Sequence, residues 1–191
     1  MSQRKKMIRT NKELLDYVRK KCDSDTITEL IFPLSHTIIE QNKKVNAVYI
    51  IKAGIAKCFL TDENGDDFVE EFFGEGEIVG EIEIINNQLS FCKISALTEL
   101  SVYKISASSF NDLLDKDKIF NQLILRALAT KIQYTALRHT HNQLHDVEAN
   151  VLKLQREFPE IFHAIPKLDI ANYLGITLRS LNRVLRHLSS T

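Results

Sequence analysis

The spacing of apolar positions changes along the chain, and each change predicts a different kind of element. Within residues 11–30, Leu14 and Val18 fall on one helical face among charged neighbours, which predicts a short amphipathic helix. Between residues 48 and 105 the apolar positions come in short runs or alternate with polar ones, as they do in strands. Beyond this segment the apolar period is about 3.6 residues, so the rest of the chain is predicted to be helical.

The strand-rich segment contains regularly placed turn signals. Residues 48–54 and 55–60 are predicted to form two strands separated by a glycine turn. Asn64 and Gly65 form a dipeptide that tolerates the positive φ of a tight hairpin turn, so we expect a further strand over residues 68–73. Many short strands with regular turns predict a barrel or a sandwich.

A single long helix is predicted for residues 108–143, which contain neither Pro nor Gly. The 3-4 spacing of two helices lying side by side is followed by Leu125, Leu128, Ile132, Thr135, His139 and Asn142. We expect a dimer seam formed by Leu125, Leu128, Ile132 and Thr135. A second face, expected to lie on the strand-rich domain, carries Phe120, Ile124, Ala127 and Tyr134. The alternative is a helix that packs only against its own domain, because the seam becomes polar after Ile132.

A small helical unit is predicted to begin at Asp146, the expected N-cap of a helix over residues 147–158. Farther along, Pro166 suits the first turn of a helix, and Gly175 suits the left-handed residue that ends it. Thr177 is then the expected cap of the next helix. Two short helices joined by a glycine turn are typical of a helix-turn-helix.

The last predicted helix has one apolar and one basic face. Leu181, Val184, Leu185 and Leu188 share the first face, and Arg179, Asn182, Arg183 and Arg186 share the second. In a major groove, Arg donates two hydrogen bonds to guanine and Asn pairs with adenine, while other arginines hold phosphates. We therefore predict DNA contacts from Thr177, Arg179, Ser180, Asn182, Arg183 and Arg186. The alternative is a solvated basic face on an ordinary helical hairpin.

Charge is segregated along the chain. The 191 residues have a formal net charge of zero, so any nucleic-acid contact must use a local basic surface. Residues 40–104 contain 12 acidic residues against 6 lysines, whereas residues 177–191 contain three arginines and no acidic residue. The chain is 44% hydrophobic, which argues against disorder, and its apolar runs are too short to cross a membrane. We expect no membrane association.

Few side chains are candidates for catalysis, metal binding or redox chemistry. Cys22, Cys58 and Cys92 are odd in number and widely spaced, which argues against a disulfide framework or a metal knuckle and fits a reducing cytoplasm. We expect three structural thiols, with a redox-sensing cysteine as the alternative. His139, His141 and His145 lack a one-face metal spacing, so no metal site is expected. No nucleophile with a spaced base and no phosphate loop is found, so we expect neither an enzyme nor a bound cofactor.

These features resemble the Crp/Fnr family of bacterial regulators. The resemblance is carried by residues 169–175, by Ser180 and Arg183, by Gly54, and by residues 76–82. It implies an α+β fold with an N-terminal double-stranded β-helix, or jelly-roll, sensor domain and a long dimerisation helix. A small all-α, winged-helix-like helix-turn-helix domain would follow.

The resemblance also implies domain boundaries and partners. The sensor domain is expected over residues 1–107, the dimerisation helix over residues 108–143 and the DNA-binding domain over residues 144–191. A cytoplasmic homodimer on pseudo-palindromic double-stranded DNA is implied, with RNA polymerase as a candidate partner. The chain stops at Thr191, so most or all of the family's wing is expected to be lacking. Family members usually carry an acid where this chain has Arg179, so the operator should differ.

The resemblance places a candidate effector pocket in the sensor domain. Its residues would be Gly80, Glu81, Ile82, Ser90, Phe91 and Thr135. Family members that bind cyclic nucleotides hold the ribose with a Gly-Glu pair, matched by Gly80 and Glu81, and hold the phosphate with an arginine. Here Ser90 and Phe91 occupy the arginine segment, and only Lys93 or Lys57 could substitute for it. We therefore expect no control by cyclic AMP, and leave an unidentified small-molecule effector open.

Some alternatives remain at this stage. Gly80 could be a backbone requirement, and Glu81 a structural carboxylate that accepts backbone N–H groups. The chain could be a β-roll module for ligand or protein binding whose helical tail does not read DNA. It could also be a regulator that is always competent for DNA and needs no ligand.

Overall fold

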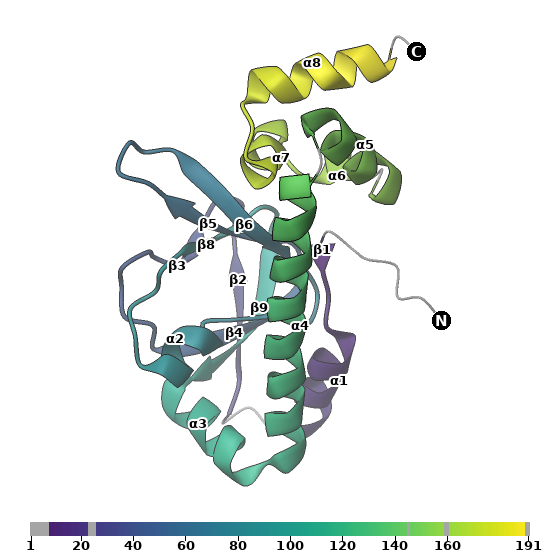
Figure 1. The fold of residues 1–191 in the computed structure, drawn as a ribbon. Helices are drawn as coiled ribbons and strands as arrows, with labels where there is room; N and C mark the ends of the chain where they lie inside the picture. The colour runs from purple at the N-terminus through teal and green to yellow at the C-terminus, as the bar shows by residue number, and fades with distance from the viewer. Residues whose placement is uncertain (1–7, 23–25, 145, 159–160, 190–191) are drawn as a thin grey trace.

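The computed structural model describes residues 8–22, 26–144, 146–158 and 161–189, which form a mixed α+β fold (Figure 1). Its strands make two sheets, with the orders β1-β6-β5-β8-β3 and β2-β9-β4-β7. The strands are β1 Ile8–Arg9, β2 Thr28–Phe32, β3 Thr37–Ile39, β4 Ala47–Ala53, β5 Ala56–Thr61, β6 Asp67–Phe73, β7 Ile78–Val79, β8 Lys93–Ala96 and β9 Leu100–Ser106. The two sheets form the predicted β-roll.

The helices lie beside and beyond this roll (Figure 1). They are α1 Lys12–Lys21, α2 Glu81–Asn86, α3 Ala107–Lys116, α4 Lys118–Leu144, α5 Val147–Glu157, α6 Ile161–Ala164, α7 Lys167–Leu174 and α8 Leu178–Ser189. Helix α4 runs along the roll from α3 to the group formed by α5 to α8. Among the described helices, none has an apolar stretch long enough to span a bilayer.

The first helix is shorter than predicted. The side chain of Asn11 accepts a hydrogen bond from the backbone N–H of Leu14 at 3.2 Å, which starts α1, and the helix ends at Lys21. The prediction of one helix over residues 11–30 is wrong in its second half, where Thr28–Phe32 forms β2. This strand pairs with β9 over five residues, so sheet pairing decides its conformation.

The β5–β6 hairpin has a longer loop than the predicted tight turn. Gly65 has a φ of +87°, but Asn64 has no positive φ. The carboxylate of Asp62 closes the loop by accepting backbone hydrogen bonds from Asn64 at 2.8 Å and from Asp66 at 2.9 Å. An aspartate that caps its own loop therefore replaces the two-residue turn.

The prediction of a single helix over residues 108–143 is wrong, because the helix is interrupted at Asp117, between α3 and α4. One carboxylate oxygen of Asp117 accepts the backbone N–H groups of Ile119 and Phe120, each at 3.0 Å. Its other oxygen accepts the hydroxyl proton of Tyr17 at 2.6 Å. An acidic N-cap held by a tertiary contact thus starts α4 without any Gly or Pro.

The inner face of α4 packs on the roll, as predicted. Phe120, Ile124 and Ala127 are buried in a cluster with α1 and with strands β4, β7 and β9. Tyr134 lies half-buried farther along, with the guanidinium carbon of Arg9 5.7 Å from its ring centroid. The helix is therefore fixed to the roll along this face, which leaves its opposite face free to meet another surface.

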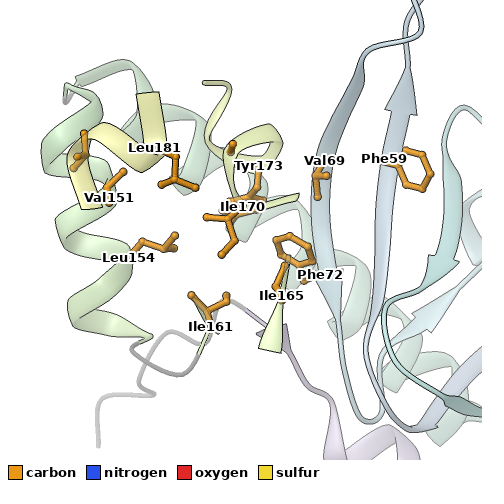
Figure 2. Close-up of a cluster of buried hydrophobic side chains, with 12 residues drawn as sticks. Phe59, Val69, Phe72, Val151, Leu154, Ile161, Ile165, Ile170, Tyr173 and Leu181 are labelled. Atoms are coloured by element: carbon orange, nitrogen blue, oxygen red, sulfur yellow. The ribbon is translucent and has the colours of Figure 1, made fainter. Parts of the chain in front are cut away.

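A separate apolar cluster joins the C-terminal helices to the roll (Figure 2). Val151, Ile170 and Leu181 come from α5, α7 and α8, and they share the cluster with Val69 and Phe72 of β6. The rings of Phe72 and Tyr173 lie 5.2 Å apart between centroids. The helical unit consequently docks on the roll through an apolar contact that includes β6 and Phe59 of the neighbouring β5.

Candidate DNA interface and effector cavity

Helices α7 and α8 are joined by a short turn with the predicted glycine and cap. Gly175 ends α7 in the left-handed region, with a φ of +67°. The backbone N–H of Ile176 then donates to the carbonyl of Ala171 at 3.0 Å, and the hydroxyl of Thr177 accepts from the N–H of Ser180 at 3.1 Å. Both helix ends are thereby satisfied locally. Pro166 lies one residue before α7, at its N-cap.

Helix α8 separates its two faces as the sequence pattern predicts. Leu181 and Val184 are buried in the C-terminal cluster. Arg179, Arg183 and Arg186 are exposed, and this part of α8 has no acidic residue. The candidate residues on the outer side of α8 and its cap, named here the arginine face, are Thr177, Arg179, Ser180, Asn182, Arg183 and Arg186. Figure 1 places α8 at the end of the molecule opposite α3.

Two ion pairs flank the apolar contact between the helical unit and the roll. The ammonium of Lys57 on β5 lies 2.5 Å from a carboxylate oxygen of Asp169 on α7. Arg138 near the end of α4 pairs with Glu70 at 2.8 Å, and its guanidinium carbon lies 4.9 Å from the ring centroid of Tyr173. Burial raises the pKa of Tyr173, so this phenol stays neutral. The first pair ties α7 to β5, the second ties α4 to β6, and the ring contact of Arg138 joins α4 to α7.

A cavity of about 290 Å³ lies between the roll and α4. Five of the six predicted effector residues line it: Gly80, Glu81, Ile82, Phe91 and Thr135. Ser90 does not, and that prediction is wrong. Its buried hydroxyl oxygen lies 2.6 Å from the carbonyl oxygen of Cys92 and 3.1 Å from Glu83 Oε1, so it faces into the wall.

Gly80 and Glu81 have clear structural roles in the cavity wall. Gly80 has a φ of +89°, and a Cβ there would lie 2.8 Å from the carbonyl oxygen of Ala47. Glu81 is only 1% exposed and pairs with Lys131 at 2.5 Å. The ammonium of Lys131 also donates to the carbonyl of Ile78 at 2.6 Å. The carboxylate of Glu81 thus has a lysine partner from α4, where backbone N–H groups were expected.

A second buried ionic group lies around Arg9 of β1. Its guanidinium is 3.1 Å from Glu77 and 3.6 Å from Glu71. Burial raises the pKa of Glu71 to about 7, although Arg9 opposes the shift. Oε1 of Glu71 is buried and has no hydrogen-bond partner among the described residues. Sequence reasoning missed both Arg9 and Lys131, because each reaches the cavity from an element distant in sequence.

The cavity wall is net acidic. Its ionisable lining residues are the acids Glu70, Glu71, Glu81 and Glu83 and the bases Arg9 and Lys131, apart from two thiols. Both bases are already paired with carboxylates. The two cations weighed as arginine substitutes lie elsewhere, since Lys57 pairs with Asp169 and Lys93 with Glu40 at 3.4 Å. An anionic ligand would therefore meet no unpaired cation in this lining.

The predicted seam residues of α4 differ in exposure. Leu125 and Ile132 are 60% and 71% exposed, which is unusual for such large apolar side chains. Leu128 is half-buried against the roll, and Thr135 is exposed and borders the cavity. The side chains of His139 and Asn142 fall outside the described part of the chain, as do those of His141 and His145. No set of three or more metal-binding side chains occurs within the part that is described.

Comparisons with known proteins agree with this architecture. Residues 29–117 match the cyclic nucleotide-binding domain family. An "anaerobic regulatory protein" of Pasteurella multocida is 27% identical over 178 residues, which is 86% of this chain and 64% of that protein. The chain therefore spans slightly less than two thirds of this relative's length. A "cAMP-activated global transcriptional regulator CRP" of Salmonella typhimurium is 21% identical over 168 residues, covering 82% of this chain and 80% of that one.

A solved structure shares the fold over most of the chain. It is described as a "putative transcriptional regulator of the crp/fnr family" from Eubacterium rectale, with a TM-score of 0.75 and 15% sequence identity. The match covers 91% of this chain and 83% of that one. It extends the similarity in fold beyond the matched domain.

Proposed function

The chain belongs to the Crp/Fnr family of transcription regulators, and on this premise we propose that it is a dimeric, non-enzymatic regulator that reads double-stranded DNA through α8. The observation that carries the proposal is the arginine face. Arg179, Arg183 and Arg186 are exposed on one side of a helix whose other side is buried. A helix of this kind fits a major groove, where arginine side chains reach base edges and phosphates.

In this proposal α7, the Gly175 turn and α8 form the helix-turn-helix. Arg179 and Arg183 read bases, and Asn182 is the candidate contact to adenine. Arg186, one turn beyond Asn182, is the candidate phosphate contact, because it is an exposed cation farther along the same face. Residues 1–107 act as the sensor domain, residues 108–143 as the dimerisation segment with its break at Asp117, and residues 144–191 as the DNA-binding domain.

Dimerisation is proposed to use the outer face of α4. Leu125 and Ile132 are two turns apart on this face and strongly exposed, so a second copy of the chain would bury both. Two copies related by a two-fold axis would present their α8 helices about one DNA turn, roughly 34 Å, apart. A pseudo-palindromic operator follows from that symmetry. The proposed place of action is the cytoplasm, with RNA polymerase as a candidate partner.

The test is DNA binding to duplexes selected from genomic fragments of the host, measured by fluorescence anisotropy at several salt concentrations. We expect the affinity for duplex DNA to fall steeply as the salt concentration rises, because basic side chains that neutralise DNA phosphates release counterions on binding. Arg183→Ala should relax discrimination at one base pair, by on the order of 1–3 kcal/mol. Arg186→Ala should weaken all sequences about equally and reduce the salt slope.

A charge-matched control separates base reading from a general loss of positive charge. Arg19→Ala with Lys104→Ala removes two exposed cations far from α8, and we expect it to leave discrimination unchanged. Arg179→Ala with Arg183→Ala removes the same charge from the arginine face and should abolish discrimination. Equal discrimination by these two double variants would favour the alternative of a β-roll module whose helical tail does not read DNA.

A further inference from the structure

Two thiols meet in the wall of the cavity. The Sγ atoms of Cys58 and Cys92 lie 2.8 Å apart, and both side chains are buried from bulk solvent. Both residues also line the cavity, so a small molecule inside it can reach them. The third cysteine, Cys22, follows α1 at its C-terminal cap and does not line the cavity.

Sheet register explains why these two side chains meet. Strands β5 and β8 run antiparallel, with Cys58 opposite Ile94. Cys92 lies in the bend directly before β8, two residues before Ile94, and its side chain is buried on the same interior side. The side chains of Cys58, Cys92 and Ile94 are all buried in one cluster. The pairing of β5 with β8 thus places Cys58 beside the start of β8, where Cys92 lies.

We propose that Cys58 and Cys92 form a reversible intramolecular disulfide, with a small uncharged peroxide as the oxidant. One thiol, as its thiolate, attacks a peroxide oxygen, so the O–O bond breaks and a sulfenic acid forms with loss of water. The second thiol attacks that sulfur, forming the S–S bond and releasing a second water. Overall, two thiols and one hydrogen peroxide give one disulfide and two waters. A disulfide needs an S–S distance of about 2.0 Å, so only a small approach is required from 2.8 Å.

The surroundings decide which oxidants can act and how fast. The hydrogen bond to Cys92, together with burial, raises the pKa of Cys58, so little thiolate forms at neutral pH. Oxidation should therefore be slow, so the disulfide should accumulate only during sustained exposure to peroxide. The acidic wall and limited volume of the cavity disfavour glutathione disulfide, which is large and anionic. Hydrogen peroxide is neutral and small enough to enter.

The position of Cys58 links this pair to the helical unit. The residue directly before it on β5 is Lys57, whose ammonium lies 2.5 Å from Asp169 on α7. Lys57 also pairs across the sheet with Ser95, three residues after Cys92. A disulfide that draws β5 at Cys58 towards the bend before β8 would move this part of β5 and with it the contact to α7. This regulatory consequence rests on the proposed DNA-binding function, whereas disulfide formation itself does not.

The first experiment maps the cross-link in the full wild-type chain. Reduced protein is treated with hydrogen peroxide, remaining thiols are alkylated in denaturant, and peptides are analysed by mass spectrometry. We expect one intramolecular link between Cys58 and Cys92 that dithiothreitol reverses, with Cys22 still alkylated. Cys22→Ser should give the same link, and Cys58→Ser should give none. Separate alkylation of Cys58 and Cys92 after oxidation, or equally rapid cross-linking by glutathione disulfide, would overturn the proposal.

The second experiment measures duplex binding before oxidation, after oxidation and after reduction. We expect an affinity change of about fivefold or more that reduction reverses, typical of coupling between two sites. Cys22→Ser should behave like wild type, and Cys58→Ser should show no change on oxidation. A mapped disulfide with unchanged DNA affinity would overturn the regulatory link. Failure of the reduced protein to bind any duplex would instead contradict the proposed function and leave the mapped disulfide standing.

Discussion

Single residues in the cavity wall combine burial with charge, and Glu71 is the clearest case. It lies beside Arg9 and Glu77 in a site almost closed to solvent, and one of its oxygens has no partner among the described residues. Burial raises its pKa to about 7, with Arg9, Arg138 and Lys131 opposing the shift. A carboxyl whose pKa is higher in the folded state than in the unfolded state stabilises the fold only while it is protonated.

The first prediction concerns stability between pH 4.5 and 8. The contribution of Glu71 should be fully present below its unfolded pKa and be lost as pH rises through about 7. Glu71→Gln should remove this loss, making the variant less pH-dependent than wild type by on the order of 2–3 kcal/mol. Urea unfolding at pH 5 and pH 8 measures the difference.

The control for this measurement is Glu99→Gln, which changes an exposed acid and should follow the wild-type pH profile. Burial also raises the pKa of Glu77, so part of the pH dependence should remain in Glu71→Gln. Identical pH profiles for wild type and Glu71→Gln would show that Glu71 is ionised in the fold throughout this range.

At the scale of elements, most of the fold follows from local pattern, and the exceptions have tertiary causes. Alternation and glycine turns predicted β4 and β5, and the cap and glycine signals predicted α7 and α8. The break at Asp117 was missed, because its local cap on Ile119 and Phe120 interrupts no apolar period and its second contact, Tyr17, is one hundred residues away in sequence. Strand β2 depends likewise on its partner β9. The spacing of apolar residues along the chain indicates which side chains are buried. It does not indicate which distant residue each of them contacts.

The candidate sites show the same limit. The arginine face lies on one helix, so its spacing alone was sufficient to place it. The cavity draws Arg9 from β1, Glu81 from α2 and Lys131 from α4, and no local pattern connects these three residues. Ser90 was assigned to the cavity by its position in a segment, yet its hydroxyl turns into the wall towards Glu83. Contacts between elements therefore set the chemistry of the cavity.

The second prediction tests α4 as the dimer element. Ile132→Asp places a charge in the middle of the proposed seam, so we expect monomers by sedimentation velocity at micromolar protein concentration. Specific duplex binding should be lost with the dimer. Because Ile132 is 71% exposed in the single chain, the melting temperature of the monomer's fold should change little.

Gln133→Asp is the matched control, since it adds the same charge at an exposed neighbouring position on a different side of α4. It should remain dimeric. A wild-type protein that sediments as a monomer, or an Ile132→Asp variant that stays dimeric, would contradict the assignment of the seam.

At the scale of the whole molecule, the roll, α4 and the helical unit meet in one region. The cavity lies against α4 at Lys131 and Thr135, and α4 continues to Arg138, which pairs with Glu70 of β6. The same strand carries Val69 and Phe72 into the apolar contact with α7. Contiguous contacts therefore run from the cavity wall to α7, which shares its apolar cluster with α8. A ligand could act through these contacts only if the cavity can bind it.

The last prediction is that cyclic AMP and cyclic GMP do not bind at micromolar concentrations. A cyclic phosphate carries a negative charge, and the cavity offers it four carboxyl groups and two bases that are already paired. Losing a charge-assisted bidentate contact to arginine costs on the order of 2–5 kcal/mol, which is roughly 30-fold to several thousand-fold in affinity. Calorimetric titration should show no binding heat up to about ten times a typical micromolar dissociation constant.

The structure also indicates where a phosphate-binding cation would have to be placed. Ser90 is buried in the wall, whereas Phe91 is 51% exposed and lines the cavity, so Phe91→Arg should gain measurable nucleotide affinity and Phe91→Ala should not. A micromolar isotherm with the wild-type chain would contradict the electrostatic argument. If Lys131→Ala then abolished that isotherm, Lys131 would have to leave Glu81 to neutralise the phosphate, and the cavity would be a nucleotide site with a different cation.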